Sequence, residues 1–144
     1  VLASRHYQSG MMTLRQLEFS IFDLRLHSDF DSINGTYLEL LNEVRQQVAV
    51  IIPPSYNRFA NSFGHIFGGG YAAGYYSYKW AEVLACDVFS MFDGKSGAEL
   101  SALGKKYQET ILSQGSLRPM MENFIAFMGR EPDLAALLKY SGMN

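Results

Sequence analysis

Apolar side chains recur at intervals of three and four residues between positions 11 and 27, which is the period of one buried helix face. The residues at this spacing are Leu14, Leu17, Ile21 and Leu24, with Phe22 and Leu26 beside them. This pattern predicts a helix over 11–27 whose leucine stripe faces a core. The polar and glycine-containing stretch 29–35 that follows predicts a turn.

A second helix is expected to begin at Thr36, because a Glu three residues later, Glu39, completes the pattern of a capping box. Its inward side chains are expected to be Tyr37, Leu40, Leu41, Val44 and Val48. Pro53 and Pro54 end the helix, since proline has no N–H to donate to the helical ladder.

Residues 53–70 contain two prolines and four glycines, so neither helix nor strand is favoured there. A long helix is predicted from Tyr71 to Phe92, ended by Asp93 and Gly94. Ser96 and Glu99 form a second candidate capping box, which opens a helix that ends near residue 113. Prolines at first-turn positions and glycines at the ends suit two later short helices: Pro119 and Pro132, Gly129 and Gly142.

No stretch alternates between apolar and polar residues with a period of two, so the pattern predicts an all-α protein. Several packed helices and one long Gly-rich irregular loop are expected, within a single domain over residues 1–144. A length of 144 residues with 48% hydrophobic and 18% charged residues is enough for one core and excludes a disordered chain.

Charge and composition mainly exclude certain classes of protein. A formal net charge of −2 gives no general attraction to nucleic acid or to anionic membranes. No apolar run approaches the roughly 20 residues of a membrane span, and the first residues lack the apolar stretch of a signal peptide. A single cysteine, Cys86, excludes an internal disulfide and fits a reducing compartment, so a cytoplasmic location is expected.

The candidate chemistry lies in residues 63–80. Tyr71, Tyr75 and Tyr78 are spaced i, i+4 and i+7, which places them on one face of the expected helix. His65 and the glycines at 68–70 come just before them. A phenol is a neutral donor at pH 7, so it can stabilise the oxyanion that forms when water attacks a peptide bond. The segment offers neither a nucleophile nor a base for that attack.

Other interpretations of the same residues stay open. Tyrosines at helical spacing also form half-buried packing faces whose hydroxyls reach water, and a loop histidine can be an ordinary surface residue. Arg58, in the irregular loop, could bind the carboxylate of a peptide, but an exposed loop arginine is also common.

The block from His65 to Trp80 resembles the C-terminal active-site segment of the zinc metallo-oligopeptidases, the family of oligopeptidase A, thimet oligopeptidase and dipeptidyl carboxypeptidase. Similarity extends to residues 14–19, 22–27 and 129–132, and it is nearest to the oligopeptidase A type. The resemblance implies that the chain is the C-terminal portion of a larger helical peptidase catalytic domain, which hydrolyses short peptides.

In that family a His-Glu-x-x-His helix and a later Glu bind zinc. The resemblance implies that Tyr78 donates to the oxyanion, with Tyr71 sharing this task or contacting substrate. It also implies that His65 hydrogen-bonds the substrate backbone and that Tyr75 points the same way. The glycines would let the loop adapt to different peptides: Gly68, Gly69 and Gly70.

None of the three histidines, His6, His27 and His65, begins a His-Glu-x-x-His motif. The zinc ligands are therefore expected outside this chain, in an N-terminal part of the same enzyme, and this chain alone is expected to bind no metal and to be inactive. Three alternatives remain: a dipeptidyl carboxypeptidase, a non-catalytic helical module that binds peptides, and a nucleotide-binding helical domain, to which the glycines before a helix would belong.

Overall fold

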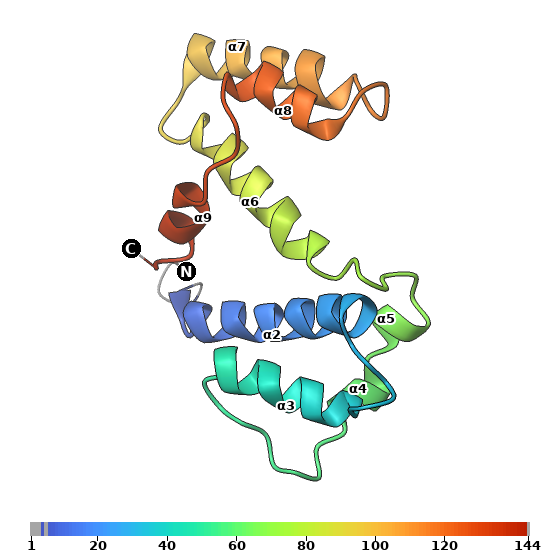
Figure 1. Ribbon diagram of the computed structural model, residues 1–144. Coiled ribbons are helices and arrows are strands. Elements are labelled where there is room, and N and C mark those ends of the chain that lie inside the picture. Colours follow the sequence, from blue (N-terminus) through green and yellow to red (C-terminus); the bar gives the residue numbers. More distant parts are fainter. Residues whose placement is uncertain (1–3, 5, 144) are drawn as a thin grey trace. The chain divides into compact units, whose positions relative to one another are not determined.

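The computed structural model describes residues 4 and 6–143, and it is all-helical over this part of the chain, as predicted (Figure 1). The prediction that the chain begins without a signal peptide concerns its first residues, and residues 1–3 and 5 lie outside the described ones. The chain separates into two compact units, Val1–Lys79 and Trp80–Asn144. The expectation of a single domain stays a prediction.

The first unit is built on helices α2 (Ser9–Ser28) and α3 (Tyr37–Val48), which pack against each other. Two single helical turns follow, α4 (Phe59–Ser62) and α5 (Gly64–Phe67), in the stretch expected to be irregular. Figure 1 shows α5 beside the end of α2. Buried apolar side chains from the four helices, together with Phe63 between α4 and α5, form one core: Phe22, Leu40, Leu41, Val44, Ala60, Phe63 and Ile66.

The capping box at Thr36 is confirmed. The Thr36 hydroxyl oxygen accepts the Glu39 N–H at 3.2 Å, and the Glu39 carboxylate accepts the Thr36 N–H at 2.8 Å. These two bonds satisfy amide groups that have no partner within the helix, which fixes where α3 begins. The helix ends at Val48, several residues before Pro53.

The buried face of α2 differs from the predicted one. Leu14, Leu17 and Ile21 are only partly buried, and Leu24 is 38% exposed. The fully buried positions of this helix include Phe22 and two carboxylates, Glu18 and Asp23. A hydrophobic pattern cannot reveal this face, because burial of a carboxylate depends on partners that come from distant parts of the chain.

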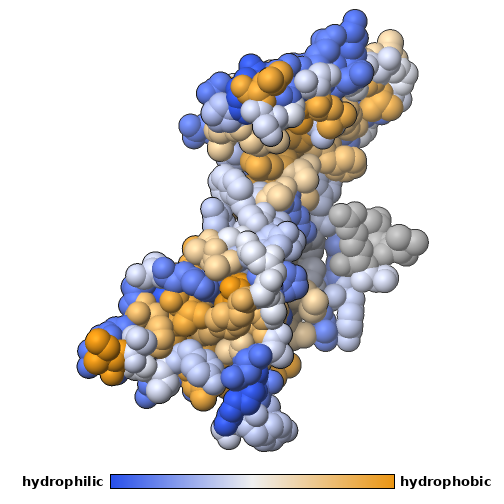
Figure 2. Space-filling model, turned by 90° about the vertical axis from the view of Figure 1, so that its right-hand side faces the viewer, coloured by the Kyte–Doolittle hydropathy of each residue, from blue (hydrophilic) through white to orange (hydrophobic). Residues whose placement is uncertain are grey.

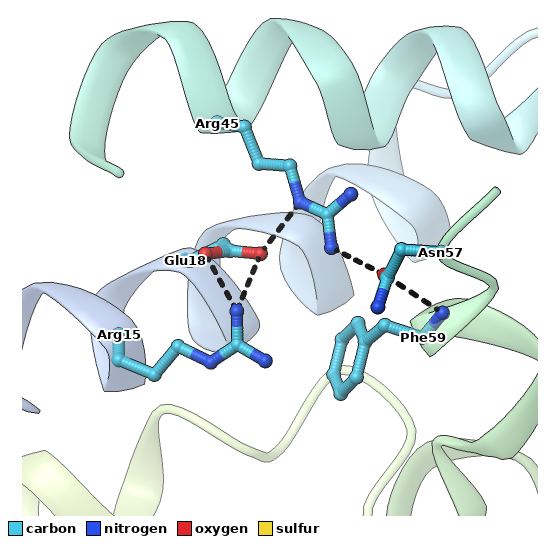
Figure 3. A network of polar contacts seen from close by, with 5 residues as sticks. All are labelled: Arg15, Glu18, Arg45, Asn57 and Phe59. Carbon is cyan, nitrogen blue, oxygen red and sulfur yellow. Dashed lines mark hydrogen bonds and ion pairs between the residues drawn. The ribbon is translucent and has the colours of Figure 1, made fainter. Parts of the chain in front are cut away.

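One of these carboxylates, Glu18, is the centre of a polar network (Figure 3). Its side chain accepts from Arg45 Nε at 2.9 Å and from Arg15 Nη1 at 3.2 Å. Arg45 also donates to Asn57 Oδ1 at 3.0 Å, and Asn57 accepts the Phe59 N–H at 3.2 Å. The network therefore ties α2, α3 and the loop before α4 together through a pair of buried opposite charges.

The second unit contains most of α6 (Ser77–Ser90), together with α7 (Gly97–Tyr107), α8 (Met120–Met128) and α9 (Ala135–Tyr140). A π-helical stretch over Gln108–Leu112 continues α7. Apolar side chains of α6, α8 and α9 are buried: Val83, Phe124, Phe127, Ala136 and Leu137.

The predicted helix ends in this part are confirmed in some places and differ in others. Helix α7 begins directly after Ser96, as predicted, but the Ser96 side chain makes no capping bond and Glu99 pairs instead with Lys95 at 2.5 Å. Pro119 stands at the N-cap of α8 rather than in its first turn. Pro132 lies outside α9, which begins at Ala135. Gly129 ends α8 with a left-handed φ of 76°, as predicted, because glycine adopts this conformation without a steric penalty.

Asp87 and Arg130 form a two-pronged ion pair within this unit. Arg130 Nη1 and Nη2 donate to the two Asp87 carboxylate oxygens at 2.7 and 2.6 Å, and the Asp133 N–H adds a bond of 2.9 Å. The hydrogen bonds from Arg130, which outweigh the opposing effect of burial, hold the pKa of Asp87 below its ordinary 3.8. The pair links α6 to the loop between α8 and α9.

This lowered pKa predicts an acid-sensitive contribution to stability. A carboxyl whose pKa is lower in the folded state stabilises the fold fully above its unfolded pKa, and the contribution disappears as the pH falls through the folded value. Unfolding temperatures measured between about pH 6 and pH 2 should fall less steeply in Asp87→Asn than in the parent protein. Glu131→Gln, which removes a nearby exposed carboxylate, should keep the parent slope; equal slopes for all three proteins would contradict the prediction.

Apolar side chains also reach the surface, as Figure 2 shows over parts of both units. The most exposed ones include Ile33, Val50, Ile51, Tyr56 and Leu117. Within the described residues, no helix has both the length and the apolar character that a membrane span requires.

Candidate functional site

The Gly-rich loop is a tightly hydrogen-bonded turn. The Gly68 and Gly69 N–H groups both donate to the Gly64 carbonyl, at 2.9 and 2.8 Å, and the Tyr71 N–H donates to the His65 carbonyl at 3.1 Å. A Cβ at Gly69 would lie 3.0 Å from the His65 carbonyl oxygen and 3.1 Å from its Cα, so a side chain there would force the backbone of the turn to shift. Gly70 has a φ of +77°. The turn therefore places Tyr71 next to His65.

The helix that carries Tyr78 begins later than predicted. Helix α6 starts at Ser77, so Tyr71 and Tyr75 lie in the preceding turn and the predicted helical stripe is wrong as a geometry. Ala73 adopts a left-handed φ of +56°, which a regular right-handed helix does not allow. The Gly74 N–H donates to the Tyr71 carbonyl at 2.8 Å, so the segment is a tight turn instead.

The turn nevertheless brings the predicted side chains together. The His65 ring centroid lies 5.9 Å from that of Tyr71, 5.5 Å from Tyr75 and 6.1 Å from Tyr78. Tyr71 and Tyr78 stack with centroids 5.2 Å apart and an interplanar angle of 20°, and Tyr75 meets Tyr78 edge-on at 5.2 Å. We call these four residues the His–Tyr cluster; all of them belong to the Val1–Lys79 unit.

The cluster is accessible to solvent. Tyr71 is 39% exposed and Tyr78 is 45% exposed, so neither is sealed in the core. A hydrogen bond with Tyr71 raises the pKa of Tyr78 above its ordinary 10.0, and burial and the neighbouring phenols add to the effect. The Tyr78 phenol therefore stays protonated, as a donor to an oxyanion must be.

Tyr75 differs from its neighbours because its hydroxyl is engaged by helix α2 and not by another member of the cluster. It donates to Gln16 Oε1 of α2 at 2.9 Å, and burial raises its pKa above the ordinary value. Its ring packs edge-on against Phe19 and Phe63, which belong to the core and its rim. The predicted contact between Tyr75 and a substrate stays a prediction.

Arg58 contacts the backbone of its own loop. Its Nη1 donates to the Ser55 carbonyl at 2.6 Å and to the Asn57 carbonyl at 3.4 Å, and the side chain is otherwise exposed. The contacts hold it to its own loop, so its predicted role in binding a peptide carboxylate stays a prediction.

The sequence pattern missed Asp23 of α2. This residue is fully buried, and its two carboxylate oxygens accept the N–H groups of Ala73 and Tyr75, both at 2.9 Å. His27 Nδ1 lies 3.0 Å from the same carboxylate. One feature of the sequence could have indicated it: Asp23 is an acidic residue directly after Phe22 in an apolar stretch. A carboxylate that is buried in such a stretch needs specific hydrogen-bond partners.

The described residues do not fit a zinc site. No group of three or more His, Cys, Asp and Glu side chains within them is placed to hold a metal ion. In the cluster, His65 is surrounded by phenol rings, which are not the ligands that zinc prefers. The cluster can therefore donate hydrogen bonds, but it does not supply a metal centre.

The chain is 46% identical over 145 residues to oligopeptidase A of Salmonella typhimurium and 47% identical to oligopeptidase A of Escherichia coli, with all of this chain covered in both cases. It is 37% identical to dipeptidyl carboxypeptidase of Salmonella typhimurium over 96% of its length.

The chain spans about a fifth of the length of these relatives (21% of each oligopeptidase A and 20% of the carboxypeptidase). The family model described as peptidase family M3 matches residues 1–143, which is nearly the whole chain. On this match, and with a helical fold that carries the predicted cluster, the chain belongs to peptidase family M3.

Proposed function

We propose that this chain is the substrate-binding and oxyanion-stabilising part of a cytoplasmic zinc oligopeptidase that hydrolyses short peptides. The observation that carries the proposal is the His–Tyr cluster, where two stacked phenols and a histidine lie together at an accessible surface. The family match and the relatives named oligopeptidase A support it.

Each member of the cluster has a distinct proposed role. Tyr78 donates to the oxyanion that forms at the scissile carbonyl, because its raised pKa keeps the proton on the phenol. Tyr71, stacked on Tyr78, shares this task or contacts substrate. His65 hydrogen-bonds the peptide backbone, and Tyr75 lines the same surface. Water is activated elsewhere, since the cluster contains no carboxylate that acts as a base.

The turn that carries these side chains also forms the floor of the proposed binding surface. Gly68, Gly69 and Gly70 are all exposed, and without side chains they allow a peptide backbone to approach closely. Arg58 is proposed to meet a peptide carboxylate. The zinc ion is supplied by residues outside this chain, in the N-terminal part of the same enzyme. Apolar side chains exposed on both units support the need for such a partner.

The proposal predicts metal-dependent peptide cleavage by the full-length protein. A quenched fluorescent peptide of about ten residues should be cleaved, a chelator should abolish the cleavage, and added Zn²⁺ should restore it. The 144-residue chain, tested at the same concentration, should show no cleavage. Full activity of the short chain, or activity that is indifferent to the chelator, would contradict the proposal.

The similarity to a dipeptidyl carboxypeptidase favours a second candidate function, and the same assay separates the two. An enzyme that removes C-terminal dipeptides recognises the free α-carboxylate of its substrate. Amidation of the peptide C-terminus should therefore leave the rate of an oligopeptidase nearly unchanged, whereas it should strongly slow a dipeptidyl carboxypeptidase.

A further inference from the structure

The buried carboxylate of Asp23, on helix α2, bonds the backbone of the turn at residues 73–75, which lies between Tyr71 and Tyr78. Within the described residues, no other buried carboxylate bonds this turn. Asp23 is 0% exposed and lies 50 residues before Ala73 in the sequence. One oxygen accepts the Ala73 N–H and the other accepts the Tyr75 N–H, each at 2.9 Å. The two oxygens of one carboxylate thus fix the backbone N–H groups of residues 73 and 75 in the same turn.

These two bonds fall where the backbone needs support. Ala73 has a φ of +56°, a conformation that is unfavourable for an L-residue with a Cβ and that glycine adopts freely. The Ala73 and Tyr75 amides flank Gly74, and Tyr78 follows three residues after Tyr75. A rotation of the turn at Ala73 would therefore move the rings on either side of it, Tyr71 and Tyr78, relative to each other.

A second anchor on the same helix reinforces the first. Gln16 and Asp23 are separated by seven residues, two turns of α2, so they lie on one face. Gln16 takes the Tyr75 hydroxyl at 2.9 Å, and Asp23 takes the Tyr75 N–H. Tyr75 is thus held by α2 at its hydroxyl and at its backbone N–H, while Tyr71 and Tyr78 remain partly exposed.

We propose that Asp23 is a positioning residue, which sets the mutual placement of Tyr71 and Tyr78 by holding the 73–75 turn against α2. Asp23 touches no reacting atom in this scheme. Its effect on catalysis rests on the proposed oxyanion role of Tyr78, whereas its effect on the turn does not.

Asp23→Asn in the full-length protein is the direct test. The amide keeps one acceptor oxygen but presents an NH₂ group to the other N–H, so one of the two bonds is lost with almost no change in shape. Hydrogen exchange at the Ala73 and Tyr75 amides should become about 10-fold faster or more. The kcat should fall about 10- to 100-fold with little change in KM, because the phenols are displaced from their working geometry. Asp29→Asn, which removes an exposed carboxylate at the end of α2, should change neither.

Two double variants separate positioning from general stability. If Asp23 acts through the phenols, Asp23→Asn combined with Tyr78→Phe should lose little more activity than Tyr78→Phe alone. Ala73→Gly should recover part of the lost kcat of Asp23→Asn, because glycine adopts the positive φ without help. Losses that multiply in the first variant, with no recovery in the second, would overturn the proposal.

The failure of the proposed function would be recognised separately. If Tyr78→Phe leaves kcat unchanged, the oxyanion role is wrong, yet exchange at residues 73 and 75 still decides whether Asp23 holds the turn. If Asp23→Asn does not fold, hydrogen exchange in the parent protein tests the proposal instead. Its Ala73 and Tyr75 amides should be among the slowest to exchange between residues 68 and 77, and fast exchange at both would overturn the proposal.

Discussion

Tyr78→Phe in the full-length protein is expected to lower kcat about 100- to 1,000-fold while KM changes little, which is the usual effect of removing one oxyanion donor. The phenol donates to an oxygen that becomes negative only during the reaction, so its loss destabilises the transition state more than the bound substrate. Because the pKa of Tyr78 is raised by its hydrogen bond with Tyr71, the donor stays protonated throughout the neutral and mildly alkaline range.

Tyr76→Phe is the matched control for this experiment. Tyr76 is 46% exposed, nearly the same as Tyr78 at 45%, and in the described part of the chain no ring contact joins it to the His–Tyr cluster. The control should keep the parent kcat. A similar loss in both variants, or an unchanged kcat in Tyr78→Phe, would remove Tyr78 from the proposed mechanism.

Glu18→Ala is expected to destabilise the protein by about 3–5 kcal/mol, because it leaves a buried arginine without its counter-charge. The side chains of Glu18 and Arg45 are 1% and 4% exposed, and they are joined by the 2.9 Å bond drawn in Figure 3. Among the described residues, Arg45 would keep only its bond to Asn57, which does not offset the cost of burying the guanidinium. Chemical denaturation, monitored by the helical circular dichroism signal, measures the change.

Two further variants test whether buried charge is the cause. Glu43→Ala breaks a 3.1 Å ion pair with Arg25, but Glu43 is 60% exposed, so the loss should stay below about 1 kcal/mol. Replacing both partners in Glu18→Leu/Arg45→Met removes the buried charges together and should recover much of the stability lost in Glu18→Ala. If the double variant is less stable than Glu18→Ala, the cause is lost packing rather than an unpaired charge.

In the second unit, the sequence pattern predicted a helix end correctly but did not predict which side chains pair. Residues 129–132 carry part of the family resemblance, and the sequence predicts Gly129 as the end of a helix, which is confirmed. The adjacent Arg130 forms an ion pair with Asp87, which lies 43 residues away in the sequence, and no local sequence pattern predicts this pair. The Ser96 capping box was wrong although its spacing matched, because Glu99 binds Lys95 instead.

The amino-acid sequence by itself determined the helical class, the capping box at Thr36, and the residues that gather in the His–Tyr cluster, since periodicity and short motifs depend on neighbours along the chain. Only the tertiary structure decided how that cluster is built. A carboxylate of α2 bonds backbone amides 50 residues away, so a strained turn replaces the predicted first turns of α6 and still brings the rings together. Buried polar groups find their partners in three dimensions, and spacing along the chain does not encode that choice.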